Sequence, residues 1–306
     1  MKTCIFPNKI WPAHPHPLPD ELLTSWIVRT AFANGLSQYE FIKNISKSIN
    51  IKYSNIDQST PDKLLDILSI HCGISISSLY SLSIASLTEF TFKNELSFKN
   101  WIIPTRPLLK KVHNFGLQFC PQCISNDQIP YFRRSWRLAF LTYCPEHRVF
   151  LHQCCPFCGF PITSLFSSSS LKTRGINPLT HCTKCGFPLS QSPIESVRPN
   201  IAMNYYDNMI NNYYDALNNF PSQITFDAIR LWANTHISKY KYQNLYAKDL
   251  KVAYTPISNP YIPIRQHSVR ERYFSILLSL WIIANNQNNN SMHSGIKRIY
   301  TTLLLL

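Results

Sequence analysis

Seven of the ten cysteines and one histidine form four pairs in which two residues separate the partners, all within residues 120–185. The pairs are Cys120/Cys123, Cys144/His147, Cys155/Cys158 and Cys182/Cys185. A pair at this spacing can place two ligand atoms on one tetrahedral zinc ion from a single tight turn, and a second pair about 20 residues later completes the coordination. The pattern predicts two structural zinc ions, the first held by Cys3His and the second by Cys4.

A single C-x-x-C is also typical of a redox pair, but four pairs in series with similar separations favour zinc. Catalytic zinc normally leaves one position to water, whereas each predicted site already has four protein ligands. One ligand stays open, because Cys154 lies beside Cys155 and can take its place. Cys155 heads the better knuckle, since Gly159 permits the positive φ that such turns often need. Cys72 is expected to be a buried core thiol, and Cys4 has no assigned role.

The elements that must position these ligands are mainly helical. Apolar residues recur at helical spacing from Asp20 to the Asn34-Gly35 stop, and further helices are expected at residues 38–49, 60–72 and 75–81. The last two are joined through Gly73 and resemble a helix-turn-helix. The second of them lacks the arginine, asparagine and glutamine side chains that commonly read bases. A scaffold or docking role is therefore preferred for it.

We expect a mainly α fold with small zinc-ribbon β elements and a helix-turn-helix-like N-terminal domain. The predicted organisation is a proline-rich arm at 1–19, a helical domain at 20–115, tandem zinc modules at 116–198 and a C-terminal helical region at 199–306. Helices are expected in that last region at 225–236 and 269–285, before an asparagine-rich, poorly ordered tail. A serine run at 164–170 lies inside the second zinc module, where we expect mobility.

The formal net charge is +14, and the excess is spread over the whole chain. This balance favours a polyanionic partner such as nucleic acid, although basicity can also serve solubility alone. A short helix is expected at 131–140, where arginines alternate with aromatic residues and guanidinium groups suit phosphate oxygens. The alternative is that the aromatics fill the zinc fold while the arginines are solvated. The candidates for DNA contact are Arg133, Arg134, Arg137, Lys110 and Lys111.

Several enzyme signatures are absent from the sequence. There is no glycine-rich phosphate loop, no G-x-S-x-G, no H-E-x-x-H and no H-x-E of the zinc deaminases. An enzyme is therefore disfavoured. The N-terminus lacks the apolar core of a signal peptide, and no window reaches the ~18 apolar residues that span a bilayer. With metal-type cysteine spacing, we expect a protein of the reducing cytoplasm without a membrane partner.

Two stretches carry a family resemblance. Residues 12–35 combine prolines with Glu21, a Ser-aromatic pair, Arg29, alanine and Asn-Gly, in that order. Residues 119–159 run from C-P-Q-C through Trp136-Arg137 and C-P-E-H to C-P-F-C-G. Together they resemble the TniQ/TnsD family of transposon target-selection proteins. The match covers about residues 10–190 and leaves the C-terminal third outside it.

The resemblance implies an adaptor rather than a catalyst. Members of the family define where a transposon inserts, either by binding target DNA or by attaching to a CRISPR effector complex with its guide RNA. They recruit an AAA+ ATPase that licenses the transposase. By position, the resemblance implies that four residues help to form the N-terminal helical domain, which with the proline arm offers a partner-docking surface for the ATPase. These residues are Glu21, Ser25, Trp26 and Arg29.

A zinc-containing helix-turn-helix transcriptional regulator is the second hypothesis, and it predicts dimeric binding to a palindrome without an ATPase. A zinc-dependent nuclease or deaminase is the third, and it needs an open metal position. Longer family members carry extended C-terminal DNA-binding regions that residues 199–306 do not match in length. The sequence therefore leaves open whether the target is read directly or through a guide RNA complex, and whether the chain forms a homodimer.

Overall fold

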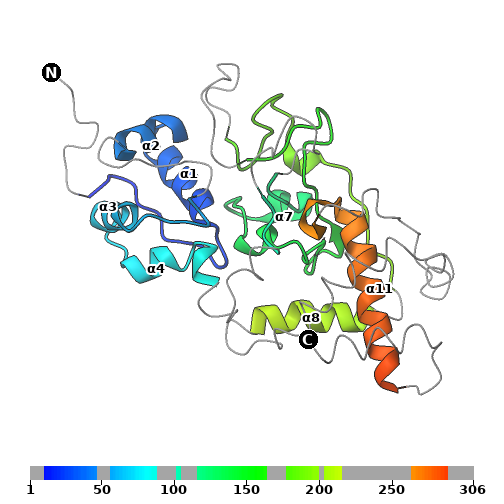
Figure 1. Cartoon of the computed structure of the whole chain (residues 1–306). Helices are drawn as coiled ribbons and strands as arrows, with labels where there is room; N and C mark the ends of the chain where they lie inside the picture. Colours follow the sequence, from blue (N-terminus) through cyan, green and yellow to red (C-terminus); the bar gives the residue numbers. More distant parts are fainter. Residues whose placement is uncertain are drawn as a thin grey trace. The chain divides into compact units, whose positions relative to one another are not determined.

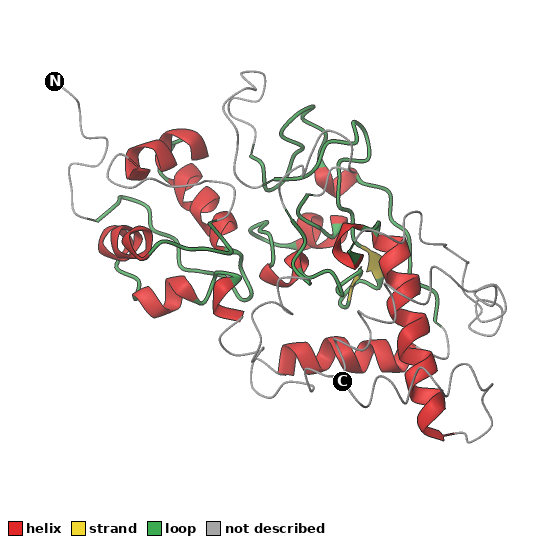
Figure 2. Cartoon of the chain, viewed as in Figure 1, coloured by secondary structure: helices red, strands yellow, loops and turns green. Residues whose placement is uncertain are grey.

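The computed structural model describes residues 10–46, 56–87, 101–104, 116–163, 177–199, 203–215 and 263–288. These residues are mostly helical with few strands (Figures 1 and 2). The chain divides into two compact units, Met1–Ser196 and Val197–Leu306. The expected helix at 225–236, the serine run at 164–170 and the C-terminal tail lie outside the described residues. Cys4, Lys110 and Lys111 do so as well.

The first unit begins with four helices, α1 Leu23–Ala33, α2 Gln38–Ser46, α3 Asp62–Cys72 and α4 Ile76–Tyr80. Glycines end two of them as expected, because Gly35 and Gly73 adopt positive φ angles of 68°. Helix α1 starts three residues later than expected. The chain before it makes a turn in which Asp20 has a φ of 53° and the Glu21 amide donates to the Leu18 carbonyl.

The core of the helical part lies between the arm and helices α1 to α4. Trp11 of the arm is 2% exposed and packs edge-on against Phe41 of α2, with ring centroids 4.7 Å apart. The same core takes Trp26 from α1, Leu68 from α3 and other apolar side chains of these elements. Cys72 also belongs to it, and its thiol donates to the Leu68 carbonyl at 2.6 Å, which confirms the expected core thiol. Residues 10–19 of the arm are thus part of the folded body.

Helix α7 Pro121–Asn126 opens the predicted zinc region. Strands β1 Tyr143–Cys144 and β2 Val149–Phe150 follow as an antiparallel pair, and short 3-10 turns occupy Arg134–Arg137 and Leu189–Gln191. The prediction of a helix at 131–140 is therefore wrong, except for the single 3-10 turn at Arg134–Arg137. Its flanks are extended because Arg133 pairs with Glu21 and Leu138 pairs with Ile102 as isolated bridges.

Gly116 lies where two backbones approach closely. A Cβ at this position would lie 2.3 Å from the Ile162 nitrogen and 2.9 Å from the Gln153 carbonyl oxygen. We expect Gly116→Ala to destabilise the fold by roughly 1–3 kcal/mol or more, because backbone atoms must move. Gly35→Ala is the comparison, since its Cβ would meet nothing within 4 Å and positive φ alone costs about 1–2 kcal/mol. Urea unfolding measures both, and a larger loss for Gly35→Ala would contradict the expectation.

The second unit is built on α8 Met203–Asp215 and α11 Val269–Asn288, with a 3-10 turn at Ile264–Gln266. The two helices pack together through Tyr206 and Tyr273, whose ring centroids are 5.7 Å apart. The helix expected at 269–285 is therefore confirmed. Helix α8 was not expected, because its many asparagines conceal a buried stripe of Met203, Tyr206 and Ile210. None of the helices in the described part of the chain has the length and apolarity needed to cross a membrane.

Candidate metal centres

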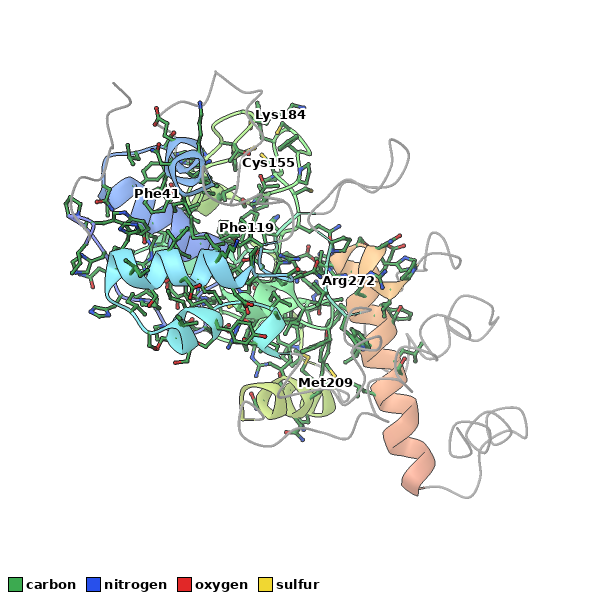
Figure 3. All side chains as sticks on the ribbon, turned by 60° about the vertical axis from the view of Figure 1, so that its left-hand side comes forward. Phe41, Phe119, Cys155, Lys184, Met209 and Arg272 are labelled. Carbon is green, nitrogen blue, oxygen red and sulfur yellow. The ribbon has the colours of Figure 1, made fainter. Side chains whose placement is uncertain are left out.

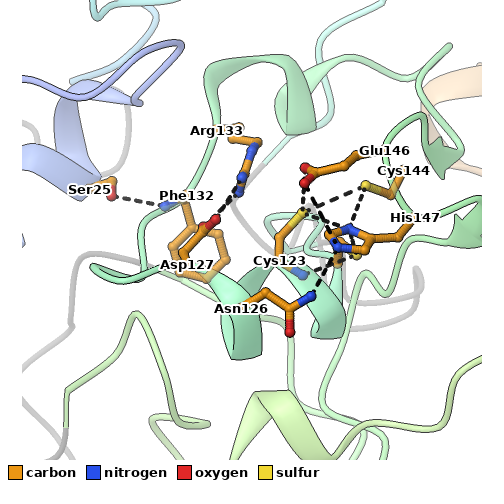
Figure 4. A network of polar contacts seen from close by, with 10 residues as sticks. Ser25, Cys123, Asn126, Asp127, Phe132, Arg133, Cys144, Glu146 and His147 are labelled. Carbon is orange, nitrogen blue, oxygen red and sulfur yellow. Dashed lines mark hydrogen bonds and ion pairs between the residues drawn. The ribbon is translucent and has the colours of Figure 1, made fainter.

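The first predicted zinc site is assembled from α7 and the β1/β2 hairpin. Cys120 caps α7 and Cys123 lies in its first turn, while Cys144 ends β1 and His147 lies in the hairpin turn (Figure 4). The Cys123 sulfur is 3.6 Å from that of Cys144 and 3.3 Å from the His147 Nδ1 atom. Tetrahedral ligands about 2.3 Å from a zinc ion lie about 3.7 Å apart. The four ligand atoms, all within 4.8 Å of one another, fit one zinc ion.

Crowding of the thiols also indicates a metal. Hydrogen bonds from Cys120 and then Cys123 lower the pKa of Cys144 to about 2, while the hydrogen bonds to Cys120 and Cys144 raise the pKa of Cys123. Thiols held this close stabilise a negative charge that a dication neutralises. The far nitrogen of His147, Nε2, lies 3.2 Å from the Asn126 amide and 3.9 Å from a Glu146 oxygen. Of these two groups, the Glu146 carboxylate is the acceptor toward which Nε2–H can point, and the Nε2–H tautomer leaves Nδ1 free for zinc.

The second predicted site joins two loops. The Cys155 sulfur lies 3.6 Å from that of Cys185, and Cys158 lies 3.7 Å from Cys182. These four sulfurs also lie within 4.8 Å of one another, so they fit one zinc ion. Figure 3 labels Cys155, whose side chain is buried. Cys154, whose backbone forms a bridge with Pro161, is not among the clustered sulfurs. The geometry therefore favours Cys155 over its neighbour.

The two loops of the second site share one backbone pattern. The Gly159 amide donates to the Cys155 carbonyl and the Gly186 amide donates to the Cys182 carbonyl, and both glycines have positive φ. Arg148 occupies the matching place after His147, where its φ is 54° and its amide donates to the Cys144 carbonyl. Three of the four ligand pairs thus use the same turn. Arginine at a positive φ is unusual, and only its place after the ligand pair could have indicated it.

The loop between the two halves of the first site attaches to the start of α1. The Leu22 amide donates to the Phe132 carbonyl at 2.9 Å, and the Phe132 amide donates to the Ser25 hydroxyl at 3.0 Å (Figure 4). Arg133 forms a bidentate ion pair with Asp127 and stacks over the Trp136 ring, 4.8 Å from its centroid. The metal centre and the helical part are therefore parts of one body.

The arginines predicted to contact DNA serve this junction. Arg137 is 2% exposed and pairs with Asp57 at 3.2 Å, and Arg134 is 8% exposed and pairs with Asp20 at 3.4 Å. Both side chains are therefore largely buried in ion pairs within the protein, and the contact of Arg134 and Arg137 with a DNA backbone stays a prediction. Arg133 is partly exposed, but Asp127 already neutralises it.

Asp57 receives three donors at the start of α1. The Thr24 amide and hydroxyl each donate to its carboxylate at 3.0 Å, and Arg137 adds the ion pair. Burial raises the pKa of Asp57, and the Arg137 charge and the Thr24 hydrogen bonds oppose that effect. Burial likewise lowers the pKa of Arg137, against the pull of Asp57. The Asp57 carboxylate and the Arg137 guanidinium therefore each need the other to stay charged. No pattern in the sequence indicated Asp57 as the partner of Arg137.

The predicted docking residues hold the arm in place. Glu21 is fully buried, and its carboxylate accepts hydrogen bonds from the Leu18 amide, the Ser25 hydroxyl and the Arg29 guanidinium. The Trp26 indole donates to the Pro15 carbonyl at 2.8 Å. Glu21, Ser25 and Trp26 are buried, so they hold the predicted docking surface together from inside, and its contact with a partner stays a prediction. The implied role in forming the domain fits these contacts.

Comparison with known families gives one match. Residues 12–151 match the family model described as TniQ. This region contains residues 12–19 of the arm, helices α1 to α4 and all four ligands of the first predicted metal site. A search of curated proteins found no match.

Proposed function

Residues 12–151 carry a TniQ-family domain, and from this domain we propose that the chain is an adaptor that recruits an AAA+ ATPase to a transposition target. The family makes it a transposition-associated protein. The observation that carries the proposal is the junction inside this domain, where the first metal site holds α1 and the arm in one body. A rigid non-catalytic surface is what an adaptor needs.

The docking surface for the ATPase is, in this proposal, the outer face of the arm. Pro12, His14 and His16 are exposed, while the inner side of the arm is tied to α1. Asn34 exchanges two hydrogen bonds with Ala13, and Arg29 donates to the His16 carbonyl. The arm therefore presents a fixed edge to a partner, and little conformational entropy is lost on binding.

The nucleic-acid contact is proposed at the second metal site. No aspartate or glutamate occurs from residue 147 to residue 194, so every charged side chain of this segment is basic. The segment thus belongs to a chain whose formal net charge is +14. Phe157 is 75% exposed and stacks in parallel on Phe187, with ring centroids 6.0 Å apart. Lys184, labelled in Figure 3, is exposed on the next loop. Exposed aromatics beside cations suit bases and phosphates, whether of target DNA or of a guide RNA in a CRISPR effector complex.

The closed ligand sets argue against an enzyme. Each predicted site has four protein ligands at tetrahedral distances, which leaves no position for substrate or water.

The hypothesis of a transcriptional regulator relies on the corner between α3 and α4. Helix α4 has only five residues and exposes the serines at 77 and 78. A helix this short and poor in base-reading side chains favours docking over groove reading.

A pull-down tests the proposal directly. The zinc-loaded protein is offered an AAA+ ATPase regulator of transposition from the same genome, with ATP and duplex DNA, at low and high salt. We expect retention that needs ATP and DNA and that weakens steeply with salt, because phosphate contacts release counterions. Zinc-stripped protein is the control and is expected to lose retention. Specific DNA binding by the protein alone, with no ATPase retained, would instead support the transcriptional regulator.

A further inference from the structure

An open cleft of about 480 Å³ lies between the end of the arm, α4 and the loop of the first metal site. Its walls include the apolar side chains of Pro17, Leu18, Ile74 and Leu82. Ser78 and Ser81 line the α4 side, and Arg134 lies among these groups. A cavity of this size holds a small ligand or a few side chains of a peptide.

Arg134 offers an unsatisfied donor to this cleft. Its Nε atom faces Asp20 at 3.4 Å, and its Nη1 atom donates to the Ser81 carbonyl and to the Ser86 hydroxyl. Within the described residues, Nη2 has no hydrogen-bond partner. The guanidinium is thus fixed by three neighbours while one edge stays available. A fixed guanidinium edge suits a carboxylate, to which it can donate charge-assisted hydrogen bonds.

Asp20 supports a binding role for the same cleft. It lines the wall with a φ of 53°, a conformation that is uncommon outside glycine. This turn lets its carbonyl accept from the Arg134 amide at 2.6 Å and its carboxylate accept from the Ser135 amide at 3.2 Å. These contacts, together with the ion pair, hold Arg134 in the position described.

We propose that this cleft binds a short segment of a partner protein in which an apolar side chain lies next to a carboxylate. The apolar side chain packs between Leu18 and Ile74, and the carboxylate receives Arg134 Nη2. A duplex backbone fits less well, because it needs several cations and Arg134 is the one permanent cation among the residues that line the cleft. The inference deepens the adaptor proposal, on which it rests for the partner's identity.

Two serines of α4 give a matched test. Ser78 lines the cleft, whereas Ser77 does not, and both are exposed in the first turn after the Ser75 cap. Glutamate is favourable at either position of a helix N-terminus, so Ser78→Glu and Ser77→Glu are both expected to fold. Only Ser78→Glu places a negative charge where the carboxylate must enter.

The probes are acetyl-Leu-Glu-amide and its glutamine analogue, titrated while the Arg134 Nε–H signal is followed by NMR. We expect the glutamate peptide to shift that signal, and the glutamine peptide and the Ser78→Glu variant to bind about tenfold or more weakly. Ser77→Glu should bind as the wild type does. Equal binding of the two peptides, or equal binding by the two variants, would overturn the proposal.

The same variants are then used in the ATPase pull-down. Retention lost with Ser78→Glu but kept with Ser77→Glu supports the cleft as the ATPase contact. Retention unchanged in both variants overturns the cleft as that contact while the adaptor function stands. If the wild type retains no ATPase, the adaptor proposal fails, and the peptide titration still decides whether the cleft binds a carboxylate. A selective loss of duplex DNA binding in Ser78→Glu would identify the anion as phosphate and overturn the peptide reading.

Discussion

Replacement of Cys155 by serine is expected to lower the zinc content from two ions per chain to one and to unfold the second metal site. Cys155 is fully buried and lies with three other sulfurs at tetrahedral distances. Zinc binding in such small sites contributes roughly 10–16 kcal/mol of apparent free energy to folding. A three-ligand site retains only part of it, so we expect a loss of several kcal/mol. Metal analysis and urea unfolding measure the two effects.

Cys154→Ser is the matched control for this prediction. Cys154 is the preceding residue, is half-buried, and is not among the clustered sulfurs. The Cys154→Ser protein should keep two zinc ions and near-normal stability, because replacing a half-buried thiol that binds no metal changes the free energy of unfolding little. If Cys154→Ser loses the ion and Cys155→Ser keeps it, the ligand set at the second site is wrong and the neighbour is the true ligand.

The metal sites could be predicted from the sequence because their information is local. Each pair, such as Cys155 and Cys158, fixes two ligands within one turn, and the turn geometry follows from Gly159. The α3 helix was predictable for the same reason, since Gly73 ends it in the left-handed conformation. In these cases, the residues that decide the structure lie within a few positions of one another.

The roles of the arginines could not be predicted, because their partners are remote in the chain. Arg134 is 114 residues from Asp20, and Arg137 is 80 residues from Asp57. Charge and spacing alone suggested a phosphate surface, whereas tertiary contacts enclose these side chains. Long-range pairing also replaced the expected helix at 131–140 with extended flanks. Tertiary contacts override local propensity in such segments.

The largest effect expected outside the metal sites comes from Asp57→Asn. Asparagine can still accept the Thr24 amide and so keep the start of α1 capped, but it removes the charge that neutralises Arg137. A buried guanidinium without its partner costs about 3–5 kcal/mol. Asp66→Asn, at an exposed position on α3, changes the net charge equally and should cost little. Urea unfolding of the three proteins gives the comparison.

A second substitution separates the buried charge from the shape of the site. In the Asp57→Asn and Arg137→Met double variant, no uncompensated charge remains, and methionine keeps much of the arginine volume. The double variant should therefore be more stable than Asp57→Asn alone, because it leaves no buried guanidinium without its counter-charge. If the double variant is the less stable of the two, Arg137 contributes mainly through its hydrogen bonds to the Ile103 carbonyl. That outcome would make the junction a backbone contact that needs no charge on Asp57.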